Sequence, residues 1–429
     1  AAPPPAATTE PLMFESTSEA GRAEWRRNWR VVLGAGVGMG TGVSLYLLLS
    51  SLFVKRITAE FDWTRGDLAL AGASAFVIAA VELVFIGRFI DRFGYRAVAL
   101  VCVPALACVY LGLTFVDGSF PFYVSLLLVA GIFGGGTGAL VYTRPVIGAF
   151  DRQRGLALAL AASGPSVASL IVAPVLAAII AAYGWRAGAY ALIVVTAFIG
   201  LPLALRLIGG AKGAKGEASD ELIDKAEVPA TLAVTLREAV RGPSFWLILA
   251  ALVAVNIPGA GVVGQLAPMI TDKGLSETQA GFTMSLYAIG LLVARVATGL
   301  ALDRFPAPNI AAIATGVPAL GAALLLLPEP SFAVAAVAVL LIGMQQGAEI
   351  DLLAFFVSRT FGTQHYGAIY GAIAMAGALS SAFGIVLFGK VHDFTKTYDI
   401  ALTVGAIAFL VGAASFFALK YTSRPASVT

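Results

Sequence analysis

Long apolar runs, separated by short polar connections, recur along the whole chain. A membrane-spanning helix needs about 20 consecutive, mostly apolar residues. Runs of this kind lie near residues 31–54, 67–87, 97–116, 122–143, 155–182, 187–208, 244–270, 277–301, 307–328, 331–358, 366–389 and 398–420. The pattern therefore predicts an all-α polytopic membrane protein with twelve transmembrane helices.

A hydrophilic stretch at residues 209–243 divides these runs six and six. Its acidic and basic residues are balanced, which predicts a solvated linker between an N-terminal half at 31–208 and a C-terminal half at 244–420. The first 30 residues are polar and Pro-rich and predict a disordered tail. Residues 421–429 form a second, short tail.

Composition supports lipid as the solvent of this chain. Of the 429 residues, 59% are hydrophobic and 12% charged, whereas a soluble domain carries about 25% charged residues. A net charge of +3 gives no reason to expect nucleic acid as a partner. The two His and two Cys residues show no metal-site spacing, and no nucleophile–base pair is evident. We therefore expect neither a cofactor nor an enzyme.

Basic residues predict the orientation. With the N-terminus placed inside, 20 Lys and Arg fall in inner segments and 7 in outer loops. Because cytoplasmic segments carry the basic excess, both termini are expected in the cytoplasm. Short loops and an Ala/Gly-rich composition favour a bacterial inner membrane.

The two halves share a short motif. Each second span ends in the pattern G-x-x-x-D-R-F, at residues 87–93 and 299–305. Two halves in the same orientation therefore look like duplicates. Parallel repeats of this kind are a transporter architecture, with the substrate held at the midplane between them.

The motif and its surroundings resemble a known family. Residues 87–96 look like the loop 2–3 signature of the major facilitator superfamily, and 299–305 look like its weaker second copy. Four further segments resemble the monocarboxylate transporter and oxalate/formate antiporter branch: 152–166, 184–186, 294–299 and 347–371.

The resemblance implies a fold, a mechanism and a set of roles. It implies two pseudo-symmetric six-helix halves that rock about a central site, in a protein that works as a monomer. It also implies that the two motifs serve conformational switching through Gly87, Asp91, Arg92, Gly94, Arg96, Gly299, Asp303 and Arg304.

Arg295 is the cation within a span. It lies 18 residues into the eighth span, about 27 Å along the helix, near the midplane or in the inner half. Its guanidinium forms a rigid fork that matches a carboxylate. The resemblance supports this role, because the branch uses an Arg at this position for the substrate carboxylate. The alternative is a structural ion pair with Glu349 or Asp351 in the tenth span.

Three carboxylates within spans are candidates for other roles. Glu349 and Asp351 lie two residues apart and so face different directions on a helix; either is a candidate carrier of a coupled proton. Glu82, near the inner end of the second span, is expected to pair with Arg88 or a neighbouring loop Arg. Arg144 is expected to reach the interface as a structural residue.

Polar uncharged side chains within the spans could complete a substrate site. Tyr46 and Tyr142 are the preferred pair, since aromatic walls with hydroxyl tips suit a small acid with an apolar tail. The remaining candidates are Asn256, Gln265, Gln345, Gln346 and Tyr370. For each of them, packing between helices is an equally good interpretation.

Some positions depart from the branch. Leu291 stands where some monocarboxylate members have an Asp, the first span carries no Lys within it, and the eleventh has none before Lys390. A single cavity cation favours a monoanion over a dianion, and the missing Asp puts proton coupling in doubt.

The sequence thus predicts a secondary transporter of small organic anions, with monocarboxylates first, protons as the coupled ion and the lipid bilayer as its surroundings. An anion exchanger is the second hypothesis. A facilitator or exporter of other solutes, with Arg295 structural, is a further one. A membrane sensor that does not transport is the alternative of a different class.

Overall fold

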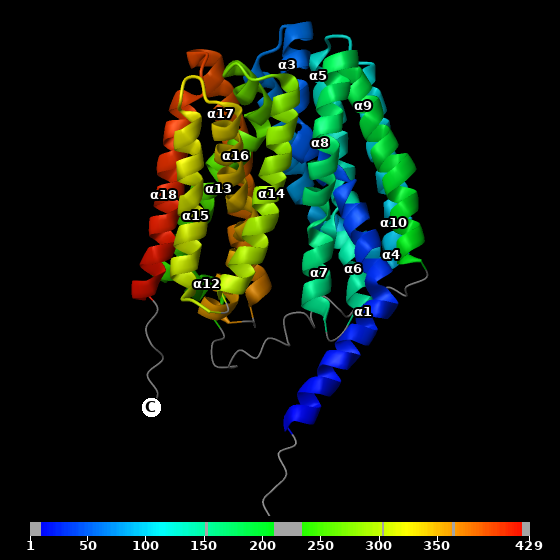
Figure 1. The fold of residues 1–429 in the computed structure, drawn as a ribbon, viewed down its shortest axis with the longest axis vertical. Helices are drawn as coiled ribbons and strands as arrows, with labels where there is room; N and C mark the ends of the chain where they lie inside the picture. Colours follow the sequence, from blue (N-terminus) through cyan, green and yellow to red (C-terminus); the bar gives the residue numbers. More distant parts are fainter. Residues whose placement is uncertain (1–9, 151–152, 210–233, 303, 363–364, 423–429) are drawn as a thin grey trace, which may run out of the picture.

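The computed structural model describes residues 10–150, 153–209, 234–302, 304–362 and 365–422. Within these ranges every regular element is a helix, and the long helices stand side by side (Figure 1). The prediction of an all-α polytopic protein is confirmed.

The N-terminal half contains several broken helices. Its elements are α1 (Glu10–Gly40), α2 (Val43–Leu49), α3 (Ser51–Phe61), α4 (Arg65–Thr114), α5 (Phe120–Gly134), η1 (Gly135–Thr137), α6 (Ala139–Ala149), α7 (Arg154–Ala162), α8 (Gly164–Tyr183), α9 (Trp185–Ile193), η2 (Val194–Gly200) and α10 (Leu201–Ile208). Most breaks fall at glycines, which adopt non-helical backbone angles at low cost.

One short helix and six long, unbroken ones make up the described C-terminal part of the chain. They are α12 (Leu236–Ala239), α13 (Pro243–Asp272), α14 (Glu277–Leu302), α15 (Ala307–Leu325), α16 (Phe332–Phe361), α17 (Tyr366–Thr395) and α18 (Asp399–Thr422). After the short α12, six helices follow in the order that the apolar runs predict.

The predicted spans map onto these elements. Ten described helices are long and apolar enough to cross a membrane, and α1 with α2, bent by 51°, makes an eleventh. The predicted span at 67–87 forms the first part of α4. Gly94, with φ of 79°, separates this part from the third span; a side chain at this φ would be strained.

The predicted N-terminal tail is described in part. We expected a disordered tail over residues 1–30, but α1 begins at Glu10. Pro11 is the second residue of this helix, and proline is tolerated in a first turn, where its missing N–H costs no hydrogen bond. Residues 1–9 and 423–429, and most of the linker at 210–233, lie outside the described residues.

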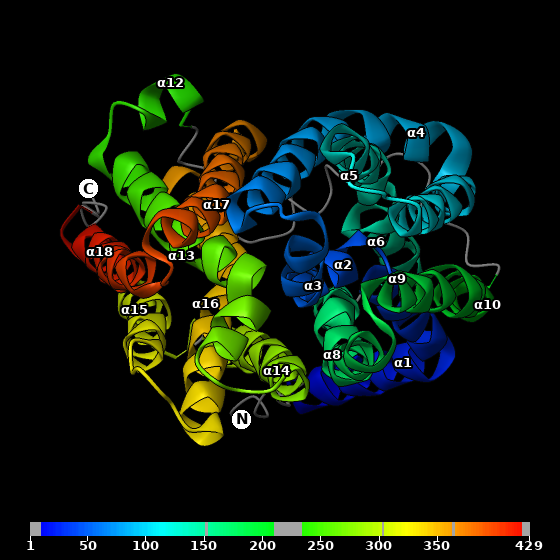
Figure 2. The same cartoon turned by 90° about the horizontal axis from the view of Figure 1, so that it is seen from above.

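The bundle has two ends, which we call the linker face and the far face. At the linker face, α10 ends and α13 begins; at the far face, α3 ends and α4 begins. The halves meet where α4 packs on α17, α8 on α14 and α3 on α13 (Figure 2).

The hydrophobic core differs between the two faces. Toward the far face, one cluster of buried side chains joins both halves, with Leu45 and Leu49 from one half and Leu266 and Met269 from the other. Toward the linker face, the described residues form two clusters, one within each half. The hydrophobic cores of the two halves are therefore joined toward the far face and separate toward the linker face.

Candidate functional site

Arg295 reaches from one half to the other. It lies on α14, seven residues before the helix ends at Leu302, and its side chain is half-buried. Its Nη1 donates a hydrogen bond of 3.1 Å to the carbonyl oxygen of Ala162. Ala162 is the last residue of α7, where the fifth span breaks. Helix C-termini carry partial negative charge and attract cations.

The packing of α14 against α16 sets the neighbours of Arg295. Gly343 packs on the backbone of Tyr287, and Gly347 packs on that of Leu291. This parallel register brings position 351 level with position 295. The side chain of Asp351 lies outside the described residues, so the predicted ion pair between the two stays a prediction.

Glu349 is held by amides. Its Oε1 accepts a hydrogen bond of 2.7 Å from Asn256 Nδ2, and its Oε2 accepts one of 2.7 Å from Gln345 Nε2. Asn256 Oδ1 in turn accepts from Ser381 Oγ at 2.8 Å. The four side chains link α13, α16 and α17 into one polar cluster within the C-terminal half. Each oxygen of the carboxylate thus has a donor.

Two other predicted glutamines have tyrosine partners. Tyr287 donates to Gln346 Oε1 at 2.8 Å, between α14 and α16. Tyr398 donates to Gln265 Oε1 at 3.0 Å, close to the far face. Gln265 therefore lies apart from the Glu349 cluster, although Gln265 and one member of that cluster, Asn256, are both on α13.

The structure does not bring Tyr46 and Tyr142 together. Tyr142 is 1% exposed and packs on Gly38 in the core of the N-terminal half at the linker face. Tyr46 packs on the core that joins both halves, with its ring 5.6 Å from that of Tyr110. The sequence places both residues in spans but gives no information about their depth relative to each other.

Tyr370 and the switch residues lie near the linker face. Tyr370 stacks on Tyr366 with ring centroids 5.3 Å apart. Arg92 lies over the ring of Phe93, and Arg96 Nε donates to Tyr95 Oη at 3.1 Å. Of the remaining switch residues, Gly87, Gly94 and Gly299 have open space beside them, and Arg304 is exposed. The side chains of Asp91 and Asp303 lie outside the described residues.

The predicted ion pair of Glu82 is not formed with any described residue. We expected an ion pair with Arg88 or a nearby Arg, but neither carboxylate oxygen of Glu82 has a hydrogen-bond partner among the described residues. The side chain is 9% exposed and lies against Gly135 of the fourth span. Glu82 is thus buried against the fourth span, whereas Arg88 is exposed.

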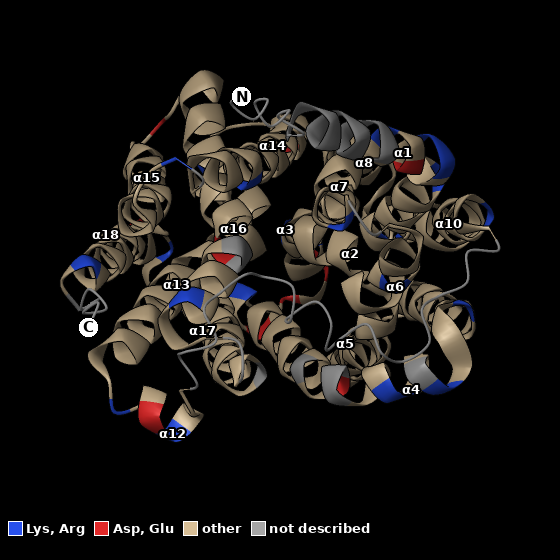
Figure 3. Cartoon of the chain, turned by 90° about the horizontal axis from the view of Figure 1, so that it is seen from below, with Lys and Arg blue, Asp and Glu red and all other residues tan. Residues whose placement is uncertain are grey.

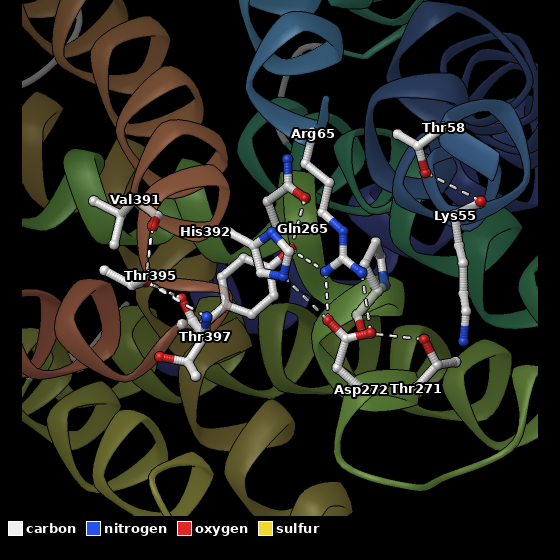
Figure 4. Close-up of polar contacts among 12 residues, drawn as sticks. Lys55, Thr58, Arg65, Gln265, Thr271, Asp272, Val391, His392, Thr395 and Thr397 are labelled. Carbon is white, nitrogen blue, oxygen red and sulfur yellow. Dashed lines mark hydrogen bonds and ion pairs between the residues drawn. The ribbon is translucent and has the colours of Figure 1, made fainter. Parts of the chain in front are cut away.

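A network of polar side chains joins the halves at the far face (Figure 4). Arg65 of α4 binds both carboxylate oxygens of Asp272 at the end of α13, and Nη2 donates to Oδ1 at 3.0 Å. Arg65 Nη1 also donates to Tyr398 Oη at 2.7 Å. His392 Nε2 lies 3.5 Å from Asp272 Oδ2.

Further pairs extend this contact between the halves. Arg56 Nη2 lies 2.9 Å from Glu277 Oε2, and Lys390 Nζ lies 3.1 Å from Asp67 Oδ1. The backbone N–H of Gly66 donates to Asp393 at 3.0 Å. These residues were not predicted, because a charge near a span end gives no signal of its partner in the other half.

The chain is similar in sequence to known membrane transporters. Residues 31–385 match the family model described as the Major Facilitator Superfamily. The chain is 27% identical over 337 residues to a gentisate transporter of Corynebacterium glutamicum, covering 74% of this chain and 72% of that one. It is 27% identical over 319 residues to monocarboxylate transporter 13 of Bos taurus, covering 70% of each.

Solved structures show the same arrangement of helices. A crystal structure of a D-xylose–proton symporter aligns with a TM-score of 0.70 at 15% identity, covering 91% of this chain and 97% of that one. A bacterial homologue of the human lysosomal transporter Spinster, in an inward-facing and unoccupied conformation, aligns with a TM-score of 0.68 at 16% identity, covering 94% and 99%. At these identities the likeness concerns the fold.

Proposed function

Since this chain belongs to the major facilitator superfamily, we propose that it is a secondary transporter of small organic anions, chiefly monocarboxylates. The observation that carries the proposal is the position of Arg295, a permanent cation on a spanning helix that contacts the other half. Its curated relatives include a gentisate transporter and a monocarboxylate transporter, which supports the same substrate class.

The contact between Arg295 and Ala162 suits exchange for a substrate. The carbonyl of Ala162 is a neutral acceptor. A carboxylate presents two charged oxygens to the guanidinium, and such charge-assisted hydrogen bonds are about twice as strong as neutral ones. An incoming carboxylate would therefore displace the carbonyl and loosen the link between α14 and α7. Substrate binding and movement of the halves are coupled in this way.

The direction of access follows from the two faces. The far face holds the ion pairs between the halves, whereas the cores are separate at the linker face. Lys and Arg gather on α1, α4 and α10 at the linker face (Figure 3), which favours the cytoplasmic side of a bacterial inner membrane. We therefore propose that this conformation admits substrate from the cytoplasm and that the far face opens in the alternate state.

Proton symport is the proposed source of energy. Glu349 and Asp351 are the candidate carriers on α16, the helix that packs beside Arg295. Hydrogen bonds from the amides of Asn256 and Gln345 hold the carboxylate of Glu349 within the C-terminal half. Asn256, which donates to Glu349, and Gln346, three residues before Glu349 on the same helix, are the proposed ligands of the substrate's polar groups.

Uptake into proteoliposomes tests the proposal. Radiolabelled gentisate, benzoate, lactate and pyruvate are offered with and without an inward proton gradient to wild type, Arg295→Ala and the exposed control Arg241→Ala. Truncating one partner of a charged hydrogen-bonded pair costs about 2–5 kcal/mol. We expect accumulation of at least one acid, dependent on the gradient, to be lost in Arg295→Ala and kept in Arg241→Ala.

Other outcomes would replace the proposal. Uptake that requires a preloaded anion and ignores pH identifies an exchanger. Normal transport by folded Arg295→Ala makes Arg295 structural and reopens the substrate class. Binding without any transport favours a sensor.

A further inference from the structure

Glu82 is a buried carboxylate that the proposed transport cycle does not use. It lies on the second-span part of α4 and is 9% exposed. The backbone N–H of Gly136 approaches its carboxylate, but neither oxygen completes a hydrogen bond with a described residue. Glu349 differs, because each of its oxygens accepts from an amide.

The carboxylate fits against a break in the fourth span. A Cβ atom on Gly135 would overlap Glu82 Oε2, and one on Gly136 would overlap the Cys102 thiol. Gly135 begins η1, the short segment between α5 and α6. Glycine at this position is therefore what admits the carboxylate to the break.

This break is connected to the breaks of three other spans. Thr137 Oγ1 accepts from the N–H of Val43, the first residue after the bend in the first span, at 2.9 Å. A Cβ on Gly40 would lie 2.6 Å from the carbonyl oxygen of Gly164, where the fifth span breaks. A Cβ on Gly200, at the end of the π-helical turn η2, would overlap Thr41. The irregular turns of four helices thus form one layer, which we call the break layer.

The surroundings of Glu82 contain little that could stabilise a charge. The titratable group that faces it among the described residues is the Cys102 thiol, on the third-span part of α4. The α5–η1–α6 segment presents the backbone of Gly135 and Gly136, and no charged side chain of the described residues acts on the carboxylate. An ionised carboxylate without partners in such a site is costly.

We propose that Glu82 is a proton-binding site of the N-terminal half, and that it exchanges its proton only when the break layer opens. In the closed layer the neutral acid fits against Gly135. Loss of the proton leaves a charge that must gain water or a backbone N–H, and the irregular turn at Gly135–Thr137 is where such donors become available. Protonation and the bending of the four spans are linked through this one contact.

The inference rests on the proposed transport function for its second readout, but not for its first. The first readout is infrared difference spectroscopy of the purified protein without substrate, titrated over pH, in wild type, Glu82→Gln and Glu349→Gln. We expect a band from buried protonated carboxyl groups in wild type, one component of which is lost in Glu82→Gln and kept in Glu349→Gln. A band that is unchanged in Glu82→Gln overturns the proposal.

The second readout compares two modes of transport. We expect Glu82→Gln to exchange labelled for unlabelled substrate across the membrane but not to accumulate it against a gradient. Accumulation equal to wild type overturns the proposal. If no carboxylate is transported by wild type, the function proposed above fails, and the infrared result alone decides on Glu82.

A second variant serves as a control for loss of folding. Glu82→Met replaces the acid by an apolar side chain of similar length, and it should also lack this component of the band and the accumulation. A site that holds a neutral acid must accept a neutral replacement. Failure of both Glu82→Gln and Glu82→Met to fold would therefore also overturn the proposal.

Discussion

Arg65 and Asp272 join the two halves of the transporter through two parallel hydrogen bonds at the far face. Arg65 begins α4 in one half, and Asp272 ends α13 in the other. The arginine side chain is 13% exposed, so the pair is shielded from solvent on one side. In the proposed cycle, this pair is what keeps the far face closed.

Asp272→Asn should open the far face more often. The amide keeps the shape of the carboxylate but loses its charge, and hydrogen bonds to charged groups contribute about 1.5–3 kcal/mol. Cysteine pairs placed across the far face, read by spin-label distances, should show a larger open population in Asp272→Asn than in wild type. Glu329→Gln, on a loop away from the interface, is the control; equal populations in Asp272→Asn and wild type would contradict the gating role.

The breaks in the N-terminal half should tolerate no added methyl group at their contacts. A Cβ on Gly164 would overlap the carbonyl of Gly36, and overpacking costs about 1–3 kcal/mol. Gly155, one element earlier, has nothing within 4 Å. We expect Gly164→Ala to lower the melting temperature and transport, and Gly155→Ala to leave both unchanged or raise the melting temperature. Equal behaviour of the two variants would show that the close approach is unimportant.

Glu349→Gln should disturb the polar cluster. Both oxygens of Glu349 accept from amide N–H groups, so a glutamine places its own N–H against a donor. Leaving a buried donor unsatisfied costs about 1–3 kcal/mol. A lower melting temperature is expected in Glu349→Gln, with partial recovery in the double variant Asn256→Asp/Glu349→Gln, which restores an acceptor opposite the new donor. No recovery would mean that the hydrogen bond is not what stabilises this region.

Acid should remove a small contribution to stability from Glu60, which lies beyond the first predicted span at the far face. Burial alone would raise the pKa of Glu60, but hydrogen bonds from Trp185 and Arg186 lower it below its usual value of 4.5. The contribution to stability is therefore present above pH 4.5 and lost as the pH falls through the folded-state pKa. Because the pair is 38% exposed on both sides, it amounts to no more than about 1 kcal/mol.

Thermal unfolding of wild type and Glu60→Gln across pH measures this effect. The two curves should differ slightly at neutral pH and converge in acid. Curves that stay apart at the lowest pH would assign the difference to packing rather than to charge.

The sequence predicts the fold well for a physical reason. Each spanning helix must satisfy its own backbone within lipid, so the apolar runs locate the helices independently of their neighbours. The kink at Gly94 falls between the predicted spans at 67–87 and 97–116. The tail at residues 1–30 stays a prediction; α1 begins at Glu10, within the stretch of prolines and polar residues on which that prediction depends.

The candidate site is harder to read from the sequence. Rarity alone identifies Arg295 and Glu349, since few charges lie within spans. Contacts between helices do not follow from rarity: Tyr46 and Tyr142 belong to different cores, and Gln265 bonds to Tyr398 near the far face. The amide partners of Glu349 come from α13 as well as its own helix, and no periodicity indicates which helices are adjacent.

Carboxylate recognition by Arg295 is the central claim, and a binding comparison tests it most directly. Binding of an acid that the protein transports, and of the primary amide of the same acid, is measured by calorimetry on purified wild type and Arg295→Gln. We predict that wild type binds the acid more tightly by about thirtyfold or more, the equivalent of about 2 kcal/mol, and that Arg295→Gln binds both equally. Undiminished preference for the acid in folded Arg295→Gln would contradict the account.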